Sequence, residues 1–362
     1  MNLHIVPDSG IVDAFYENLN EAGLLANNKI VVRTNGKRLR YSKKDLPFAP
    51  LYSSTFKVLV GDTRQYKHVY IHQLSPLLYR WIATHAFSKL SWLIWGADLY
   101  NLPSIDFNMY EKLTLEYYVH KIKPLRTYLY LLKVWITNRP FRSQAYSRID
   151  FVLTWMKSEY EFAKRNIPSL KAGHQFFFYE NQSPYHQLDR FIKHERKGPR
   201  SIIIGNSGVA ENNHLDVVQL LDEKKIEADL YLPVSYGDPD YIRFLKKNLK
   251  SYAYGKLQFV DQYMNFEEYV SFLARADALI MNTIRPQGYG NILMMLYLNK
   301  PVFLNDQNIS LPDLRSNGVK YNLISEIEQG LEYRRDFNSK EAVTNLFSHT
   351  RLIGIYQELF GD

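Results

Sequence analysis

The sequence predicts an α/β protein that consists of two Rossmann-like halves, each with a mostly parallel sheet. Three observations point to this fold class. The chain has 362 residues, which at roughly 150 residues per domain is long enough for two domains. Short apolar runs alternate with amphipathic stretches, which is typical of parallel sheets covered by helices. A polar, basic stretch interrupts this pattern once, over residues 181–200.

These observations divide the chain into four parts. We expect an N-terminal domain over residues 1–180, a linker over residues 181–200, a C-terminal domain over residues 201–338 and a last helix over residues 339–362. Neither an internal repeat nor a low-complexity tract is present in the sequence.

In the first half, short apolar runs predict seven strands. They are Leu3–Val6, Ile30–Arg33, Phe56–Val60, Val69–His72, Trp92–Trp95, Phe151–Thr154 and His174–Tyr179. Helices are expected between them, notably over Pro76–Phe87 and over a long segment from about Phe107 to Ile136. Pro124 should kink or divide that segment, because its ring removes a helical hydrogen bond and clashes with the preceding turn.

In the second half, strands and helices alternate more regularly. The expected strands are Ser201–Ile204, Leu230–Val234, Leu257–Val260, Ala278–Met281 and Pro301–Leu304. The expected helices follow Gly208 through Leu221 and then cover Pro239–Leu249, Phe266–Arg275, Ile292–Leu298 and about Lys340–Phe360.

The charge is concentrated in the first part of the chain. The formal net charge is +8, but residues 1–150 hold 20 Lys/Arg against 11 Asp/Glu, whereas the rest hold 25 against 26. Such asymmetry predicts an anionic partner, namely nucleic acid, a membrane surface or a phosphorylated ligand. The alternative is a solvated basic face. The chain has no cysteine, which excludes disulfides, thiolate metal sites and cysteine nucleophiles.

No segment of the sequence reads as a membrane span or a signal peptide. The most apolar stretch, Tyr128–Ile136, is much shorter than the roughly 20 residues that cross a bilayer. We therefore expect a cytoplasmic protein or one bound to a membrane from one side. The segment Lys121–Arg142 mixes Leu, Tyr and Trp with six basic residues, which suits an anionic membrane surface. A helix packed on the sheet with a solvated basic edge is the alternative.

Two glycine turns in the second half are the strongest local signal. Each follows a predicted strand and opens a helix, which is the edge of a parallel sheet where ligands bind. In Gly205–Gly208, Asn206 and Ser207 add hydrogen-bonding groups, and His214 starts the next helix. Each turn alone is more often an ordinary tight turn.

The second turn, Arg285–Asn291, carries the arginine. Gly288 and Gly290 leave the first amides of the helix accessible, and Arg285 offers a bidentate contact to an anion. Together the two turns predict a cradle for a diphosphate.

Several common motifs are missing from the chain. No GxGxxG opens the N-terminal half, and GxxxxGK[ST], HExxH and GxSxG do not occur, which disfavours dehydrogenases, P-loop enzymes, zinc proteases and α/β-hydrolases. Asp238-Pro239-Asp240 has the form of a metal-binding DxD, but Asp238 is placed to cap a helix with Pro239 at its first position. We therefore predict no metal site and no cofactor.

Two residues of the first half are candidates for a general base. His72 ends one predicted strand, and Asp98 follows another, so both are expected at strand ends facing an interdomain cleft. The alternatives are a structural histidine and an acid that caps the following segment.

Four motifs of the chain are Leu93–Tyr100, Ile204–Gly208 with Asn213 and His214, Leu232–Pro233 with Tyr236, and Arg285–Gly290. These four motifs are similar to those of glycosyltransferase family 56. They occur in the family's order and at compatible spacing, and the resemblance extends from about His68 to Asp313.

The resemblance implies a GT-B glycosyltransferase with two facing Rossmann-like domains. The family's donor is a dTDP-activated deoxyamino sugar such as Fuc4NAc, and its acceptor is a glycan on polyprenyl diphosphate at the cytoplasmic membrane face, in enterobacterial common antigen synthesis. Arg285, Gly288 and Gly290 would then hold the donor diphosphate, Gly205–Gly208 and His214 would line the cleft, and Tyr236 would lie near the base. The further candidates in the turns are Asn206, Ser207, Gln287, Tyr289 and Asn291.

On this view Asp98 is the first candidate for activating the acceptor hydroxyl, and His72 is the second. The predicted reaction is metal-independent transfer of a sugar to a membrane-borne glycan by a peripheral protein on the inner face of the membrane. One alternative is a non-hydrolysing sugar-nucleotide epimerase of the same fold. The other is a non-catalytic protein that binds membrane or nucleic acid with its basic half, although no nucleic-acid recognition motif is found.

Overall fold

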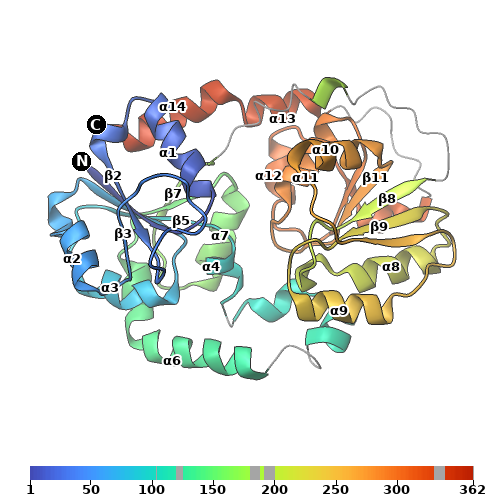
Figure 1. The fold of residues 1–362 in the computed structure, drawn as a ribbon, viewed down its shortest axis with the longest axis horizontal. Coiled ribbons are helices and arrows are strands. Elements are labelled where there is room, and N and C mark those ends of the chain that lie inside the picture. The colour runs from blue at the N-terminus through green and yellow to red at the C-terminus, as the bar shows by residue number, and fades with distance from the viewer. Residues whose placement is uncertain (103, 120–124, 180–187, 191–199, 330–338, 362) are drawn as a thin grey trace. The chain divides into compact units, whose positions relative to one another are not determined.

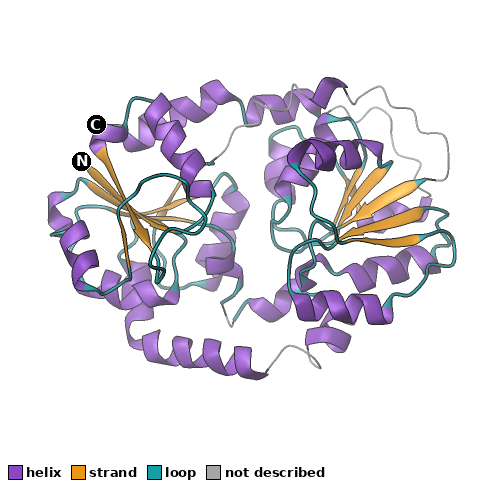
Figure 2. Cartoon of the chain, in the orientation of Figure 1, coloured by secondary structure: helices purple, strands orange, loops and turns teal. Residues whose placement is uncertain are grey.

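A computed structural model describes residues 1–102, 104–119, 125–179, 188–190, 200–329 and 339–361. The chain forms two compact units. Unit 1 consists of Met1–Ile105, Tyr128–Gln182 and Phe347–Asp362, and unit 2 consists of Asp106–Thr127 and Ser183–Leu346. Helices lie on both faces of the sheet in each unit (Figure 2).

Unit 1 is built on a parallel sheet of seven described strands in the order β3-β2-β1-β4-β5-β6-β7. β1 lies inside the sheet, where Ile5 pairs with Val31 of β2 on one side and with Ile71 of β4 on the other. The bounds are β1 (Asn2–Pro7), β2 (Asn28–Arg33), β3 (Phe48–Ala49), β4 (His68–His72), β5 (Leu90–Leu93), β6 (Phe151–Leu153) and β7 (Gly173–Gln175).

The α-helices of this part of the chain follow the alternation that the sequence predicts. They are α1 (Ile11–Glu21), α2 (Ser54–Val60), α3 (Tyr79–Thr84), α4 (Ala97–Tyr100), α6 (Leu125–Ser147), α7 (Lys157–Asn166) and α14 (His349–Phe360). One last helix was expected over about Lys340–Phe360, but the chain forms two helices there: Lys340–Leu346 belongs to unit 2, and α14 returns to unit 1, where it lies beside α1 (Figure 1). The rings of Tyr356 and Phe360 pack against Phe15 of α1, so the end of the chain completes the core of its first unit.

Unit 2 contains a second parallel sheet, with six described strands in the order β10-β9-β8-β11-β12-β13. The bounds are β8 (Ser201–Ile204), β9 (Asp229–Pro233), β10 (Leu257–Val260), β11 (Ala278–Met281), β12 (Val302–Leu304) and β13 (Asn322–Leu323). Its α-helices are α5 (Lys112–Thr114), α8 (His214–Glu223), α9 (Pro239–Asn248), α10 (Phe266–Arg275), α11 (Tyr289–Tyr297), α12 (Leu311–Ser316) and α13 (Lys340–Leu346).

Two predictions about elements in the first half are wrong. Phe56–Val60 is part of helix α2, because Ser53 caps it by accepting a hydrogen bond from Phe56 N at 3.0 Å. The long predicted helix is divided as expected, with short helical turns up to Val119 and α6 from Leu125, but its predicted end at about Ile136 is wrong. α6 continues beyond Ile136 to Ser147 although Pro140 lies inside it, and Pro124 lies outside the described residues.

The segment 106–127 was expected in the first domain, whereas the structure places it in unit 2. The carboxylate of Asp216 on α8 accepts hydrogen bonds from Leu113 N at 2.7 Å and from Thr114 Oγ1 at 2.6 Å. Asn213 Oδ1 accepts a third from Glu111 N at 2.9 Å. Most of the expected linker, residues 181–187 and 191–199, lies outside the described residues.

In the part of the chain that the structure describes, each helix is too short or too polar to span a lipid bilayer.

Candidate functional site

The two glycine turns meet at the carboxyl edge of the sheet in unit 2. They follow β8 and β11, which are paired neighbours. Gly205 (φ 71°) and Gly288 (φ 66°) both adopt left-handed backbone conformations. A Cβ atom at Gly288 would lie 2.5 Å from Met281 Cε and 3.0 Å from Asn206 Cγ. Glycine is therefore required there both for the backbone conformation and for the close approach of the turns.

Side-chain hydrogen bonds join three strand ends at this edge. Gln287 Nε2 donates to Asn206 Oδ1 at 3.1 Å, and Asn206 Nδ2 donates to Tyr236 Oη at 3.2 Å. Tyr236, which follows β9, remains 61% exposed. The structure thus brings together three residues that the sequence proposed separately.

The first turn presents only part of itself to a ligand. Ser207 is buried, and its carbonyl accepts a hydrogen bond from Asn212 Nδ2 at 2.9 Å. Gly208 packs against the side chain of Ile242, and its amide donates to Tyr236 O at 2.8 Å. Ser207 and Gly208 therefore shape the turn, while Asn206 faces the second turn.

His214 supports the first turn from within the core. It is fully buried, its Nδ1 lies 3.2 Å from Tyr241 Oη, and burial lowers its pKa to about 3. A Cβ on Gly205 would lie 2.7 Å from His214 Nε2. The sequence expected His214 to line the cleft, whereas this neutral imidazole packs beneath the backbone of Gly205.

The second turn places Arg285 beside an acid that sequence reasoning missed. Arg285 Nη2 lies 3.6 Å from Glu211 Oε1, and the two side chains are only 17% and 16% exposed. Glu211 belongs to the single turn of 3-10 helix Ala210–Asn212, which follows the first glycine turn. In the sequence, Glu211 is visible only as an acid three residues before His214, and this spacing alone is not a motif.

The remaining residues of the second turn begin α11. Tyr289 Oη donates to Ser310 Oγ, and Asn291 Nδ2 donates to Tyr269 Oη at 2.6 Å. A Cβ on Gly290 would meet no atom within 4 Å, so steric demand does not explain this glycine. Gly288 is the N-cap of α11 and makes no side-chain cap, so the positive end of the helix dipole lies at the turn.

Buried polar atoms without partners cluster at these turns. Among the described residues, five buried side-chain atoms have no hydrogen-bond partner. Three of them are His214 Nε2, Arg285 Nε and Gln287 Oε1. Because buried polar groups in proteins are nearly always paired, such a cluster is typical of a ligand site.

In unit 1, His72 is buried in a chain of polar side chains. His72 Nε2 lies 3.1 Å from His4 Nδ1, and His72 Nδ1 lies 2.8 Å from Tyr179 Oη. Only 1% of His72 is exposed, and burial together with the neighbouring His4 lowers its pKa well below the ordinary value. These contacts are those expected of the structural alternative.

Asp98 is also buried, at the start of α4. Its Oδ2 accepts hydrogen bonds from Leu74 N at 2.8 Å and Trp92 Nε1 at 2.6 Å, and its Oδ1 accepts one from Trp95 N at 3.0 Å. Burial raises the pKa of Asp98 in spite of these bonds. Both carboxylate oxygens thus accept bonds from the strand ends, and the catalytic role of Asp98 stays a prediction.

Arg33, in unit 1, is a cation that the site prediction did not include. It ends β2, and its Nη2 donates to Gln73 O at 2.8 Å and Gln73 Oε1 at 3.0 Å, while its Nε has no partner. Burial lowers the pKa of Arg33 to about 10, so it remains charged at neutral pH.

The acidic motif Asp238–Asp240 has the role that the sequence predicts. Asp238 caps α9 by accepting a hydrogen bond from Asp240 N at 2.8 Å, with Pro239 at the first position of the helix. Among the described residues, no three His, Asp or Glu side chains gather in a way that suits a metal ion.

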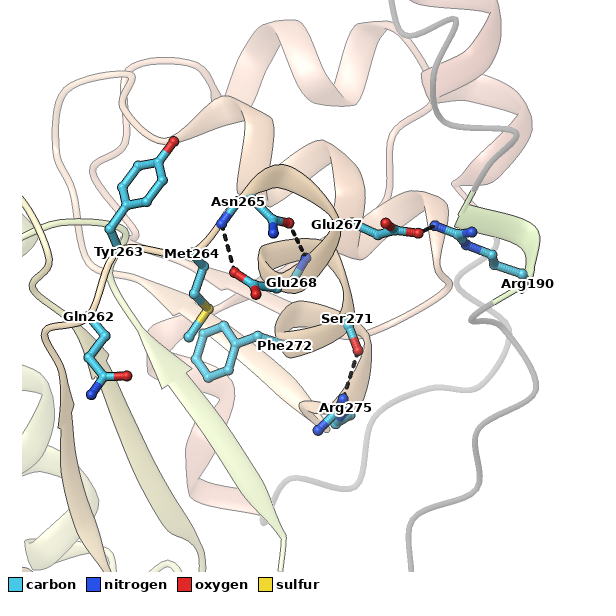
Figure 3. A pocket seen from close by; sticks show the side chains of 10 residues that line it. All are labelled: Arg190, Gln262, Tyr263, Met264, Asn265, Glu267, Glu268, Ser271, Phe272 and Arg275. Carbon is cyan, nitrogen blue, oxygen red and sulfur yellow. Dashed lines mark hydrogen bonds and ion pairs between the residues drawn. The ribbon is translucent and has the colours of Figure 1, made fainter.

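A separate open groove of about 950 Å³ runs along α10 in unit 2 (Figure 3). Its polar groups largely bind one another, since Asn265 and Glu268 form a capping box and Arg275 donates to Ser271. Arg190 pairs with Glu267 on the same helix. The groove is not lined by the residues of the two turns.

Solved structures of known proteins share this fold at low sequence identity. Sucrose-phosphate synthase from Thermosynechococcus elongatus matches with a TM-score of 0.58 and 14% identity over 99% of both chains. A glycosyltransferase from Rickettsia africae matches with a TM-score of 0.62 and 12% identity, over 99% of this chain and 97% of that one. HepE of Anabaena, solved with UDP and glucose, matches with a TM-score of 0.56 and 11% identity over 99% and 98%. The predicted GT-B fold is thereby confirmed.

The family comparison reaches further than the fold. The model of the family described as 4-alpha-L-fucosyltransferase, glycosyl transferase group 56, matches residues 137–333, which is more than half of the chain. That range contains both glycine turns, Glu211 and the third strand end at Tyr236. The protein is therefore a glycosyltransferase that belongs to glycosyltransferase family 56.

Proposed function

We propose that this glycosyltransferase takes its sugar from a nucleoside diphosphate that is bound by the two glycine turns of unit 2. The observation that carries the proposal is Arg285, whose buried Nε has no hydrogen-bond partner, in the turn that leads into α11. A diphosphate fits this place because it would accept hydrogen bonds from the Arg285 guanidinium and from helix-terminal amides. The UDP and glucose named with HepE are consistent with such a donor.

For the donor we propose a dTDP-activated deoxyamino sugar such as Fuc4NAc, on the basis of the family resemblance. Arg285 and the positive end of α11 would stabilise the charge that develops on the leaving diphosphate. We propose that this transfer needs no metal ion, since Arg285 and α11 supply positive charge and Asp238 is engaged as a helix cap. Turnover that persists in excess EDTA supports this proposal, and turnover that is lost and then restored by Mg²⁺ contradicts it.

A thermal-shift panel of dTDP, UDP, GDP and CMP tests the donor site. We expect dTDP to raise the melting temperature, because a ligand that binds only the folded protein stabilises it by mass action. Inorganic phosphate at equal concentration is the control for unspecific anion effects. A response to UDP alone corrects the donor base, and no response to any nucleotide contradicts the proposed site.

For the acceptor we propose a glycan on polyprenyl diphosphate at the inner face of the cell membrane. The charge of the units supports an anionic partner for unit 1, which holds 21 Lys/Arg against 13 Asp/Glu, whereas unit 2 holds 24 against 24. We propose Asp98 as the residue that activates the acceptor hydroxyl, with His72 as the second candidate.

The same proposal makes α6 the part of unit 1 that contacts the membrane. Leu129, Leu132 and Ile136 lie on one side of this helix and are 56%, 46% and 55% exposed. The helix contains four Lys/Arg and no Asp or Glu. An exposed apolar stripe within a basic helix suits the interface of an anionic bilayer.

Vesicle sedimentation tests this contact. The triple variant Leu129→Ser, Leu132→Ser, Ile136→Ser should lose binding to vesicles that contain anionic lipid, because its apolar stripe is gone while its charge is unchanged. Gln144→Ser, an exposed change on the same helix, is the matched control and should bind as the unaltered protein does. Equal binding of the triple variant would place the membrane contact elsewhere.

A further inference from the structure

The ion pair between Glu211 and Arg285 is an unusual feature for an anion site. The 3.6 Å between Oε1 and Nη2 exceeds hydrogen-bond length, and Arg285 Nε has no partner at all. Glu211 therefore neutralises the charge of Arg285 without using its hydrogen-bonding capacity. The guanidinium remains able to form bidentate bonds to another anion.

The fold fixes the position of Glu211 beside Arg285. Asn213, which has a left-handed φ of 50°, donates from Nδ2 to Glu211 O at 3.1 Å and to Asn282 O at 2.7 Å. Asn282 directly follows β11, the strand that leads to Arg285. The buried side-chain amide of Asn213 thus links the backbone of Glu211 to the end of the strand that leads to Arg285. This pair is therefore held in place, unlike an ion pair between mobile side chains on the surface.

A fixed carboxylate next to a diphosphate site has a predictable electrostatic effect. It attracts Arg285 when no nucleotide is bound, and it repels the phosphates when one arrives. We infer that Glu211 is the resting counter-ion of Arg285, which the diphosphate of the nucleotide displaces. Glu211 thereby holds the guanidinium in position and weakens the hold on the nucleoside diphosphate product. Glu211 is a positioning residue in this account, and the inference rests on the proposed function.

Calorimetry on four proteins tests the inference, with dTDP and UDP as probes. They are the unaltered chain, Glu211→Gln, Arg285→Ala and the double variant. Glu211→Gln should bind the nucleoside diphosphate more tightly, on the order of fivefold, because a partly buried negative charge that repels the phosphates is removed. In the Arg285→Ala background the same change should give a smaller gain, because only the direct repulsion of the phosphates is then removed. Damage to the fold would weaken binding rather than tighten it.

Two further measurements sharpen the result. dTMP carries less charge than dTDP, so Glu211→Gln should increase its affinity less. Inhibition by the nucleoside diphosphate product should become stronger in Glu211→Gln. Glu227→Gln, a change at an exposed acid of the same unit, is the matched control and should leave both affinities unchanged. Should Glu211→Gln fail to fold, Glu211→Asp withdraws the carboxylate by one methylene and should show a smaller gain.

The outcomes separate this inference from the proposed function. Unchanged or weaker binding in Glu211→Gln overturns the inference alone, provided that Arg285→Ala still weakens binding. An equal gain in both backgrounds also overturns it, because Glu211 would then act without Arg285. If neither dTDP nor UDP binds the unaltered chain, or if Arg285→Ala leaves the affinity unchanged, the inference and the proposed donor site fail together.

Discussion

The carboxylate of Asp98 connects the ends of two strands in unit 1. It accepts hydrogen bonds from Leu74, which lies just beyond β4, and from Trp92 and Trp95 within and after β5. Gln73, which lies between the end of β4 and Leu74, has a φ of 61°, which a residue with a Cβ rarely adopts. Asp98 therefore stabilises a strained corner of the sheet edge, whatever part it has in catalysis.

Asp98→Asn should lower both the stability and the turnover of the enzyme. An amide has one acceptor oxygen in place of two, so at least one of the three donors loses its partner, at a cost of about 1–3 kcal/mol. We expect turnover to be lost while nucleotide binding persists, because the glycine turns belong to unit 2. Chemical denaturation, calorimetry and a transfer assay measure these three quantities.

Asp150→Asn is the control for this experiment. Asp150 also accepts a backbone hydrogen bond, from Leu90 N at 2.8 Å at the other end of β5. It should lose some stability and no turnover. Normal turnover in folded Asp98→Asn would mean that the residue has only the structural role that its contacts describe.

At the residue scale, the sequence predicted the positions of the two turns better than the burial of the side chains within them. Glycine after a strand is visible as a letter pattern, and both turns lie where this pattern places them. Burial is not visible in that way: His214 and Ser207 belong to the same motif as Asn206 but point into the core. The Glu211–Arg285 pair joins residues 74 positions apart, and only the parallel pairing of β8 with β11 brings them together.

Helix α14 shows how the last element of the chain stabilises the first unit. Phe360 is fully buried, and its ring lies within 5.5 Å of the rings of His4, Phe15 and Tyr70. The backbone carbonyl of Phe360 also accepts hydrogen bonds from Asn2 and Asn28. The helix thus closes one end of the core around β1 and β4.

Phe360→Ala should destabilise unit 1 by about 3–5 kcal/mol, the usual cost of removing a buried phenyl ring. Glu358→Ala, an exposed change on the same helix, should stay within about 0.5 kcal/mol of the unaltered protein. Urea denaturation compares the two. A loss of less than about 1 kcal/mol in Phe360→Ala would mean that α14 is not part of the cooperative core.

At the element scale, the errors have local causes. The run Phe56–Val60 is apolar enough for a strand, and the deciding feature is the hydrogen bond from Phe56 N to the cap Ser53. The long helix was predicted to end at Ile136, but α6 continues through Pro140 to Ser147. Leu129, Leu132 and Ile136 are exposed, so the apolar residues of this helix do not mark a face that is buried against the core. The apolar pattern that usually indicates the extent of a helix is therefore missing.

For the whole molecule, four buried histidines couple stability to pH. Burial lowers the pKa of His4 to about 3, of His68 to about 4 and of His214 to about 3, and it lowers the pKa of His72 as well. Three of the four belong to unit 1. In the unfolded chain these imidazoles would titrate near pH 6.5.

We therefore expect the free energy of unfolding to fall as the pH falls from about 6.5 to about 4. In this window the unfolded chain binds protons that the folded imidazoles do not, so protonation favours unfolding, by up to about 1.4 kcal/mol per pH unit for each group. Burial also raises the pKa of Asp98 and of Asp216, which opposes the loss of stability, but as two groups against four. Urea titrations at several pH values measure the slope, and a flat profile between pH 6.5 and 5 would contradict the account.

At the scale of the molecule, the sequence predicted the fold class and the family, and both are confirmed. It could not predict that each unit is discontinuous in sequence. Residues 106–127 belong to unit 2 because of contacts such as those with Asp216, about 100 positions away. Contacts of that length leave no periodic signal in a single sequence. When charge is counted by unit and not by position in the sequence, the whole net charge of +8 lies in unit 1.

The central claim is that the two glycine turns of unit 2 bind the diphosphate of the donor through Arg285. Calorimetric titration of dTDP into the unaltered protein and into Arg285→Ala tests it most directly. We predict measurable binding to the unaltered protein and at least a tenfold loss in the variant, about 1.4 kcal/mol, because a charge-assisted bidentate contact is removed. Equal affinity of the two proteins would contradict the account.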